Sequence, residues 1–193
     1  MKSCLLCGVG GQGTVLASRI LASAAMAQGQ MARTAETIGM AQRGGCVVSH
    51  VRFGEMVASP LIPAGDADVL LGFEPGEAVR NLFYLKEGGT VIVAKTAIAP
   101  VTASLKQQAY CGEDMTAYLQ RNAAHCIMID PEQVEAACGS AKALNVALVG
   151  AAIRFGGLGL TREVVETVLQ QRVKPAYLEM NRKALAYGMS VEE

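Results

Sequence analysis

A glycine-rich stretch near the start of the chain is the clearest candidate for chemistry. It forms the pattern G-x-G-x-x-G between an apolar run at 4–9 and a segment with helical spacing from residue 14. Glycines let backbone N–H groups approach a phosphate, and the start of a helix adds unpaired donors and a positive dipole end. We therefore expect this glycine loop to bind a phosphate-bearing group. The candidate residues are Gly8, Gly10, Gly11, Gln12, Gly13 and Thr14.

Two other interpretations of the glycine loop stay open at this stage. One is a tight strand-to-helix turn that binds no ligand. The other is a dinucleotide site, which requires an acidic residue about 20 residues further on to bind a ribose. Glu36 is near that place, but the sequence around it continues into a loop of different character. A phosphate loop of the Walker A type is excluded, because no Gly-Lys-Ser/Thr closes the motif.

A second polar loop, residues 39–45, follows the next predicted strand. Its candidate residues are Gln42, Arg43, Gly44 and Gly45. The carboxyl ends of parallel strands form the edge at which open α/β sheets bind ligands, so both loops are expected there. The Arg43 guanidinium could hold a phosphate or a carboxylate through two parallel hydrogen bonds.

The elements that must position these loops alternate between strands and helices. Apolar runs predict strands at 4–9, 31–37, 69–73, 90–94 and 125–129. Helical spacing and capping residues predict helices at 14–28, 77–86, 115–123, 143–155, 161–171 and 175–187, with a further helix starting at Asp130-Pro131. This alternation predicts an α/β fold, a three-layer Rossmann-like sandwich with a mostly parallel sheet and helices on both faces.

One antiparallel element is expected in addition. The β-type run 46–53 is followed by the turn Gly54-Glu55 and by the short segment 56–59, which together predict a hairpin. We see no repeat or linker, so residues 1–193 are expected to form a single domain.

The overall composition limits the kinds of partner. Apolar residues make up 51% of the 193 residues and charged residues 18%, against a usual charged share of about 25%. The surplus of apolar residues predicts a protein interface. We therefore expect a hetero-oligomer or, for the isolated chain, a homodimer. The formal net charge of zero and the low aromatic content argue against a nucleic-acid partner. No apolar run approaches the length of a membrane span, and no membrane partner is expected.

The cysteines and histidines give no catalytic pattern. Cys4 and Cys7 are expected inside the first strand, where they would point to opposite faces and serve as small apolar residues. Six thiols and a start that does not look like a signal peptide predict a cytoplasmic setting. His50 is expected to be a satisfied strand histidine, and neither a metal site nor a catalytic residue is predicted in this chain.

Several segments carry a resemblance to a known family. Gly-Val-Gly-Gly-Gln-Gly-Thr at 8–14, Gly-Met-Ala-Gln-Arg-Gly-Gly at 39–45 and Ser-His-Val-Arg-Phe-Gly at 49–54 look like the gamma-type domain of pyruvate/2-oxoacid:ferredoxin oxidoreductases. Residues 59–63, 67–71 and 88–93 share this resemblance, as do Lys142 and Asn145 more weakly. The Gln-Arg-Gly-Gly form of the second loop favours the branch that acts on indolepyruvate.

The resemblance implies a function within a complex. This chain would be the subunit without clusters, and a larger partner subunit would hold thiamine diphosphate and the iron–sulfur clusters. The complex would convert an aryl 2-oxoacid, coenzyme A and oxidised ferredoxin to an acyl-CoA, carbon dioxide and reduced ferredoxin. The two loops are then expected to receive coenzyme A. A free-standing reductase that binds NAD(P) or flavin, and a purely structural subunit with an empty glycine loop, are the alternatives.

Overall fold

The computed structural model describes residues 1–38, 45–99 and 110–192. A six-stranded sheet with the order β2-β3-β1-β4-β5-β6 forms its centre. The strands are β1 Lys2–Val9, β2 Met31–Ile38, β3 Cys46–Gly54, β4 Ala67–Gly72, β5 Leu85–Ala94 and β6 His125–Ile129. The helices are α1 Thr14–Ala27, α2 Pro75–Arg80, α4 Gly112–Asn122, α5 Pro131–Cys138, α6 Leu144–Phe155, α7 Arg162–Arg172 and α8 Pro175–Ser190. Short 3-10 turns lie at η1 Leu82–Tyr84 and η2 Ala141–Ala143.

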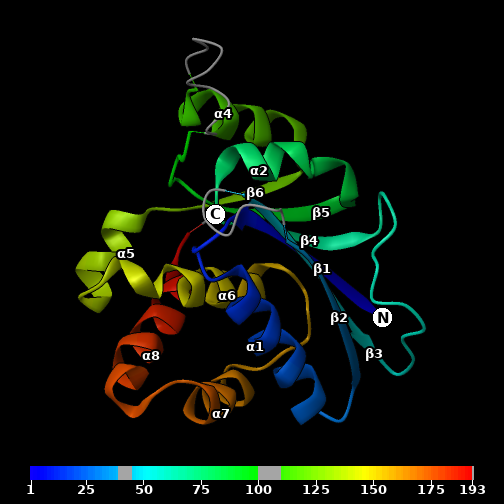
Figure 1. Cartoon of the computed structure of the whole chain (residues 1–193), viewed down its shortest axis with the longest axis vertical. Coiled ribbons are helices and arrows are strands. Elements are labelled where there is room, and N and C mark those ends of the chain that lie inside the picture. Colours follow the sequence, from blue (N-terminus) through cyan, green and yellow to red (C-terminus); the bar gives the residue numbers. More distant parts are fainter. Residues whose placement is uncertain (39–44, 100–109, 193) are drawn as a thin grey trace.

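The sheet separates two helical layers of unequal size. Figure 1 shows α2 and α4 on one face, and α1, α5, α6, α7 and α8 on the other. Each layer has its own group of buried side chains, and the larger group lies under α1 and α6. The predicted three-layer α/β sandwich is therefore confirmed.

The strand directions place the starting points of both candidate loops at one edge of the sheet. β1, β4, β5 and β6 are parallel, whereas β3 is antiparallel to both β1 and β2. Since β3 lies between β1 and β2, these two strands run in the same direction. Their carboxyl ends, from which the loops at 8–13 and 39–45 depart, therefore meet the same edge of the sheet.

The predicted hairpin of 46–53 with 56–59 is wrong in its second strand. β3 instead pairs with β2, from Ile38 opposite Val47 to Met31 opposite Gly54. Residues 56–59 form no strand. The connection from β3 to β4 instead packs Ile62 against the face of the sheet opposite α1 (Figure 1). Side chains hold this connection: His50 Nδ1 accepts from the Ile62 amide at 3.1 Å, and Arg52 donates to the Leu61 carbonyl at 2.9 Å.

The helix expected at 77–86 starts and ends earlier. Glu74 caps α2, because its Oε2 accepts from the Glu77 amide at 2.8 Å, and Pro75 fills the first helical position. The helix ends at Arg80, where the Asn81 side chain donates to the Glu77 carbonyl at 2.9 Å. The residues up to Lys86 therefore belong to a 3-10 turn and to β5.

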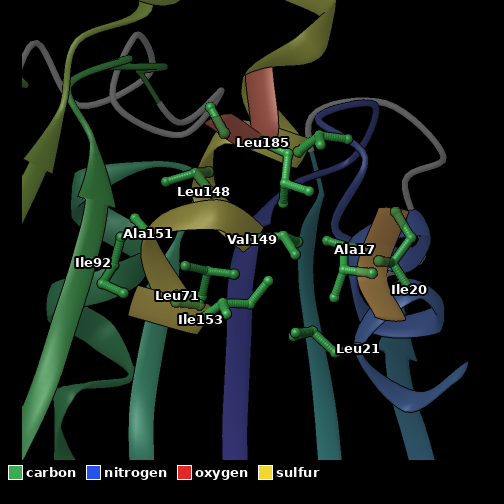
Figure 2. Close-up of a cluster of buried hydrophobic side chains, with 14 of the residues drawn as sticks. Ala17, Ile20, Leu21, Leu71, Ile92, Leu148, Val149, Ala151, Ile153 and Leu185 are labelled. Carbon is green, nitrogen blue, oxygen red and sulfur yellow. The ribbon is translucent and has the colours of Figure 1, made fainter. Parts of the chain in front are cut away.

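The larger core group depends on α6. This helix is almost wholly apolar, and Leu148, Val149, Ala151 and Ile153 are buried. Figure 2 shows α6 between the strands that carry Leu71 and Ile92 on one side and α1 with Ala17 and Ile20 on the other. The helix thus links the sheet, α1 and α8 into one packed layer, and its first turn lies beside the glycine loop.

Among the described residues, no single helix is long and apolar enough to cross a membrane. The helix α5 and residues 141–155 are long and apolar enough only when taken together, and the chain bends strongly between them.

Candidate functional site

Gly45, the last residue of the second predicted loop, contacts the glycine loop at the carboxyl edge of β1. The amide of Gly10 donates to the carbonyl of Gly45 at 2.9 Å, directly beyond the last pairing of β1 with β3 at Val9 and Cys46. The prediction that the loops share an edge is confirmed at this contact. The candidate residues Gln42, Arg43 and Gly44 lie outside the described residues.

The start of α1 offers donors that no side chain occupies. Gly13 precedes the helix with φ 86°, a left-handed conformation that glycine adopts without strain. No side chain caps the helix, and its first internal bond runs from the Ala17 amide to the Gly13 carbonyl at 3.1 Å. The amides of Thr14, Val15 and Leu16 therefore have no partner within the helix, which makes this end of α1 suited to an anion.

The side chain of Gln12 is bonded within the chain at both of its polar atoms. Its Oε1 accepts from the Val9 amide at 2.7 Å, and its Nε2 donates to the Phe73 carbonyl at 2.8 Å. The side chain thus joins the ends of β1 and β4. A role of Gln12 in ligand binding therefore remains a prediction that these two bonds do not support.

Two of the glycines are required by the packing of the loop itself. A Cβ on Gly8 would lie 2.7 Å from Gln12 Oε1 and 2.7 Å from Phe73 Cβ. A Cβ on Gly13 would lie 2.7 Å from Asn145 Nδ2, at the start of α6. Gly11, with φ 101°, has open space around it. The glycine pattern is therefore explained in part without any ligand.

The geometry disfavours a dinucleotide site. β3 separates β1 from β2, so the end of β2 lies two strand spacings, roughly 10 Å, from the end of β1. Glu36 accepts from the Ser18 hydroxyl of α1 at 3.2 Å. The carboxylate therefore contacts a helix on one face of the sheet, away from the position in which it would bind a ribose beside the glycine loop.

A carboxylate cluster on the other side of the β1–β4 crevice was missed by the sequence analysis. β1 continues into α1 on one face and β4 into α2 on the other, so the crevice is the switch point at which such sheets bind ligands. Glu74 is buried there, and its Oε1 accepts from the Tyr110 hydroxyl and, at 3.4 Å, from the Ile98 amide. The dipeptide Glu74-Pro75 after a buried strand is the signal that could have indicated this cap.

Glu77 is the second buried carboxylate of this cluster. Burial raises its pKa, and the ion pair with Arg80 at 2.9 Å opposes that rise. Its Oε2 has no hydrogen-bond partner within residues 1–38, 45–99 and 110–192. Because both carboxylates lie near Cys7, they add to the effect of burial in raising the pKa of that thiol.

The predicted roles of the cysteines and of His50 agree with the structure. Cys4 and Cys7 are fully buried, and they belong to the core groups on opposite faces of the sheet, so they cannot bind one ion together. Their pKa values are raised, mainly by burial. His50 is buried, bonded to Ile62 and in edge contact with the Tyr84 ring at 5.5 Å. Among the described residues, no group of three potential ligands could hold a metal ion.

Comparison with known proteins decides the family. The family model described as pyruvate ferredoxin/flavodoxin oxidoreductase matches residues 3–191. The chain belongs to this family. The predicted family is thus confirmed over residues 3–191.

The curated relatives of this family member are subunits of oxidoreductase complexes. The chain is 36% identical to the indolepyruvate oxidoreductase subunit IorB of Thermococcus kodakarensis, over 96% of this chain and 93% of the relative. It is 37% identical to IorB of Archaeoglobus fulgidus, over 94% and 90%. It is 28% identical to the common gamma subunit of the pyruvate/ketoisovalerate oxidoreductases of Pyrococcus abyssi, over 92% and 89%. The chain is therefore an enzyme subunit of the 2-oxoacid oxidoreductase type.

Solved structures share the fold. The keto/oxoacid ferredoxin oxidoreductase gamma subunit of Geobacter sulfurreducens matches with a TM-score of 0.69 and 24% identity, over 97% of this chain and 96% of that one. The pyruvate oxidoreductase subunit PORC of Thermotoga maritima matches with a TM-score of 0.72 and 19% identity, over 97% and 94%. A 2-oxoglutarate:ferredoxin oxidoreductase of Magnetococcus marinus matches with a TM-score of 0.70 and 16% identity, over 98% of this chain but 30% of that one.

Proposed function

We propose that this chain is the subunit without clusters in a coenzyme A-dependent oxidoreductase that acts on indolepyruvate or a related aryl 2-oxoacid. A larger partner subunit would hold thiamine diphosphate and the iron–sulfur clusters and pass electrons to ferredoxin. The support for the substrate class is that relatives at 36–37% identity are named for indolepyruvate. All six cysteines are free thiols, which fits a reducing, cytoplasmic setting.

The role of the chain in that complex would be to receive a phosphate-bearing group of coenzyme A at the carboxyl edge of β1. The observation that carries this proposal is the uncapped start of α1 beside the contact between Gly10 and Gly45. The larger oxidoreductase of Magnetococcus marinus, of which a part has this fold, was solved with coenzyme A bound. Arg43 belongs to the proposed site as a candidate clamp for a phosphate.

Isothermal titration of the assembled complex with coenzyme A tests this role. Gly10→Ala and Arg43→Ala are expected to weaken the affinity, the second by roughly tenfold for the loss of one charge-assisted contact. Arg121→Ala is the matched control, since Arg121 lies in the last turn of α4 on the opposite face of the sheet. Unchanged affinity in both loop variants would refute the proposed site.

A specific observation favours a second candidate, a purely structural subunit. The Gly10 amide and both ends of the Gln12 side chain are bonded within the chain. If Gly10→Ala and Arg43→Ala complexes assemble normally and keep full activity, the structural role is the correct one.

The isolated chain is expected to have no oxidoreductase activity. The reaction needs an electron sink and a carbanion-stabilising cofactor, and none of the described residues forms a site for a metal ion or cluster. The measurement is ferredoxin reduction by the purified chain with arylpyruvate, coenzyme A and added thiamine diphosphate. Reduction above the background without protein would contradict this prediction, and the complex with its partner is the positive control.

A further inference from the structure

A hollow lies next to the glycine loop, on the side of the sheet that carries α1 and α6 (Figure 1). It encloses about 610 Å³ between the starts of α1 and α6, the connection from α7 to α8 and the first turns of α8. This volume falls in the usual range for sites that bind small molecules, about 300–1,000 Å³. The side chain of Asn145 separates the hollow from the loop, because it lines the hollow and packs against Gly13.

The charge of the hollow is one-sided. Lys142, Arg172 and Lys174 line it, and no carboxylate does. Neither lysine forms an ion pair with any other residue in the part of the chain that the structure describes. Arg172 donates to the Ser23 hydroxyl at 2.9 Å and keeps further donors. Three cations from two separate segments, Lys142 from one and Arg172 and Lys174 from the other, converge here without a counter-charge. They fit a ligand with more than one negative charge, such as a phosphate or diphosphate.

Part of the wall is apolar. Leu16, Tyr177 and Met180 line the hollow, and Leu16 and Tyr177 are 37% and 54% exposed although they are large and apolar. An aromatic ring and a methionine are well suited to cover the face of a planar ring. A ligand that fills the hollow therefore carries an aromatic body beside its negative charges.

Two buried amides face the same space. Asn145 and Asn181 are only 7% and 6% exposed and both line the hollow. Asn145 Oδ1 accepts from the Val146 amide at 2.9 Å, whereas its Nδ2 has no acceptor among the described residues. Asn181 Nδ2 donates to the Tyr177 carbonyl at 2.7 Å. One donor and one acceptor thus remain for the edge of a heteroaromatic ring.

We propose that this hollow binds a nucleoside phosphate, with the phosphates on Lys142, Arg172 and Lys174 and the base beside Leu16 and Tyr177. The group comes either from a free nucleotide or from the nucleotide end of coenzyme A. In the second case the proposal rests on the function proposed above. The hollow is separate from the edge between Gly10 and Gly45, so the two sites are tested by different variants.

Isothermal titration of the full chain with ADP tests the proposal. Saturable one-to-one binding is expected, and adenosine, which lacks the phosphates, should bind at least tenfold more weakly. Lys142→Gln combined with Lys174→Gln should weaken ADP binding by roughly a hundredfold, about tenfold for each charge-assisted contact. Lys142→Arg with Lys174→Arg keeps the charges and should retain most of the affinity. Arg121→Gln on α4 removes a cation elsewhere and should change nothing.

Coenzyme A in place of ADP separates the two sources of the group. If the double glutamine variant has a lower affinity for both ADP and coenzyme A, the hollow binds the nucleotide end of coenzyme A. If only the affinity for ADP falls, the ligand is a free nucleotide. The two proposals fail separately, because the loop site is tested with Gly10→Ala and Arg43→Ala in the complex, and the hollow with the lysine variants of the full chain. Absence of saturable ADP binding, or equal ADP affinity in the double glutamine variant and the native chain, overturns the proposal.

Discussion

At the scale of single residues, Gln12 fixes the geometry of the crevice between β1 and β4. It satisfies one backbone donor at the end of β1 and one backbone acceptor just after β4. Partly buried backbone groups that lose such a partner cost about 1–3 kcal/mol each. The residue therefore holds the glycine loop in place, whatever ligand the loop binds.

Replacing Gln12 by leucine measures this contribution. The variant keeps a similar size but leaves the Val9 amide and the Phe73 carbonyl unpaired, so the free energy of unfolding should fall by about 2–4 kcal/mol. Urea denaturation followed by circular dichroism gives the value. Gln171→Leu, an exposed position on α7, should change stability by no more than about 0.5 kcal/mol. Equal effects of the two substitutions would contradict the role assigned to Gln12.

The residue types of the candidate site were readable from the sequence only in part. The glycine pattern and its strand–loop–helix context are local, so spacing alone predicted them. Which partners the side chains have is decided by contacts that are distant in the sequence. Gln12 with Phe73 and Gly13 with Asn145 are such contacts, and no local pattern shows that the Gln12 amide is already occupied.

At the scale of elements, the connection from β3 to β4 depends on side chains of β3. His50 accepts from Ile62, and Arg52 binds both the Leu61 carbonyl and the Asp66 carboxylate, at 2.9 and 3.0 Å. A strand pairing was predicted here because 56–59 follows a turn. Pro60 and Pro63 lack the amide that a ladder requires, and the neighbouring position on β3 is already occupied by β2.

The same histidine should make stability depend on pH. Burial lowers the pKa of His50, so the folded state favours the neutral ring that accepts from Ile62. A folded pKa below the unfolded value of about 6.5 means that this stability is present above that value and is lost as the pH falls toward the lowered pKa. Denaturation at a series of pH values between 7.5 and 5 should show this loss in the native chain. His50→Gln should show a smaller loss, and an identical pH profile in both proteins would refute the assignment.

Helix boundaries followed the sequence where caps are local. Asp130 and Thr161 cap α5 and α7 as predicted, since their side chains accept from amides two and three residues on. The predicted boundaries of α2 were wrong because Glu74 was not considered as its N-cap. That carboxylate also binds Tyr110 and Ile98, which are 36 and 24 residues away. Periodicity cannot reveal a residue that joins three separate segments.

At the scale of the whole molecule, the layer under the sheet is closed by a very tight crossing of α6 and α8. A Cβ on Gly188 would lie 1.9 Å from the Ala147 carbonyl oxygen, and one on Gly150 would lie 2.4 Å from the Leu185 carbonyl oxygen. The two helices therefore touch backbone to backbone. This contact brings α8 against the core. The first turns of α8 then form one wall of the hollow that Lys142, Arg172 and Lys174 line.

Gly188→Ala tests that crossing. Helix propensity alone predicts a gain of about 0.5–1 kcal/mol from this change, whereas the clash predicts a loss of about 3 kcal/mol. The sign of the change in unfolding free energy, measured by urea denaturation, decides between them. Ala186→Gly, two residues earlier on the same helix, is the reciprocal control and should lose only about 0.5–1 kcal/mol. A stabilised Gly188→Ala protein would mean that the helices are not in backbone contact.

The pairing of β2 with β3 has a consequence for protein engineering. The ladder runs without interruption to Ile38 opposite Val47, so the segment that joins these strands begins and ends at two neighbouring, hydrogen-bonded positions. A joining segment of another length or composition can be grafted between such anchors without changing the register of the sheet or the crossover through α1. We therefore expect that the segment between these anchors can be exchanged between related subunits while β2 and β3, which hold it, stay the same.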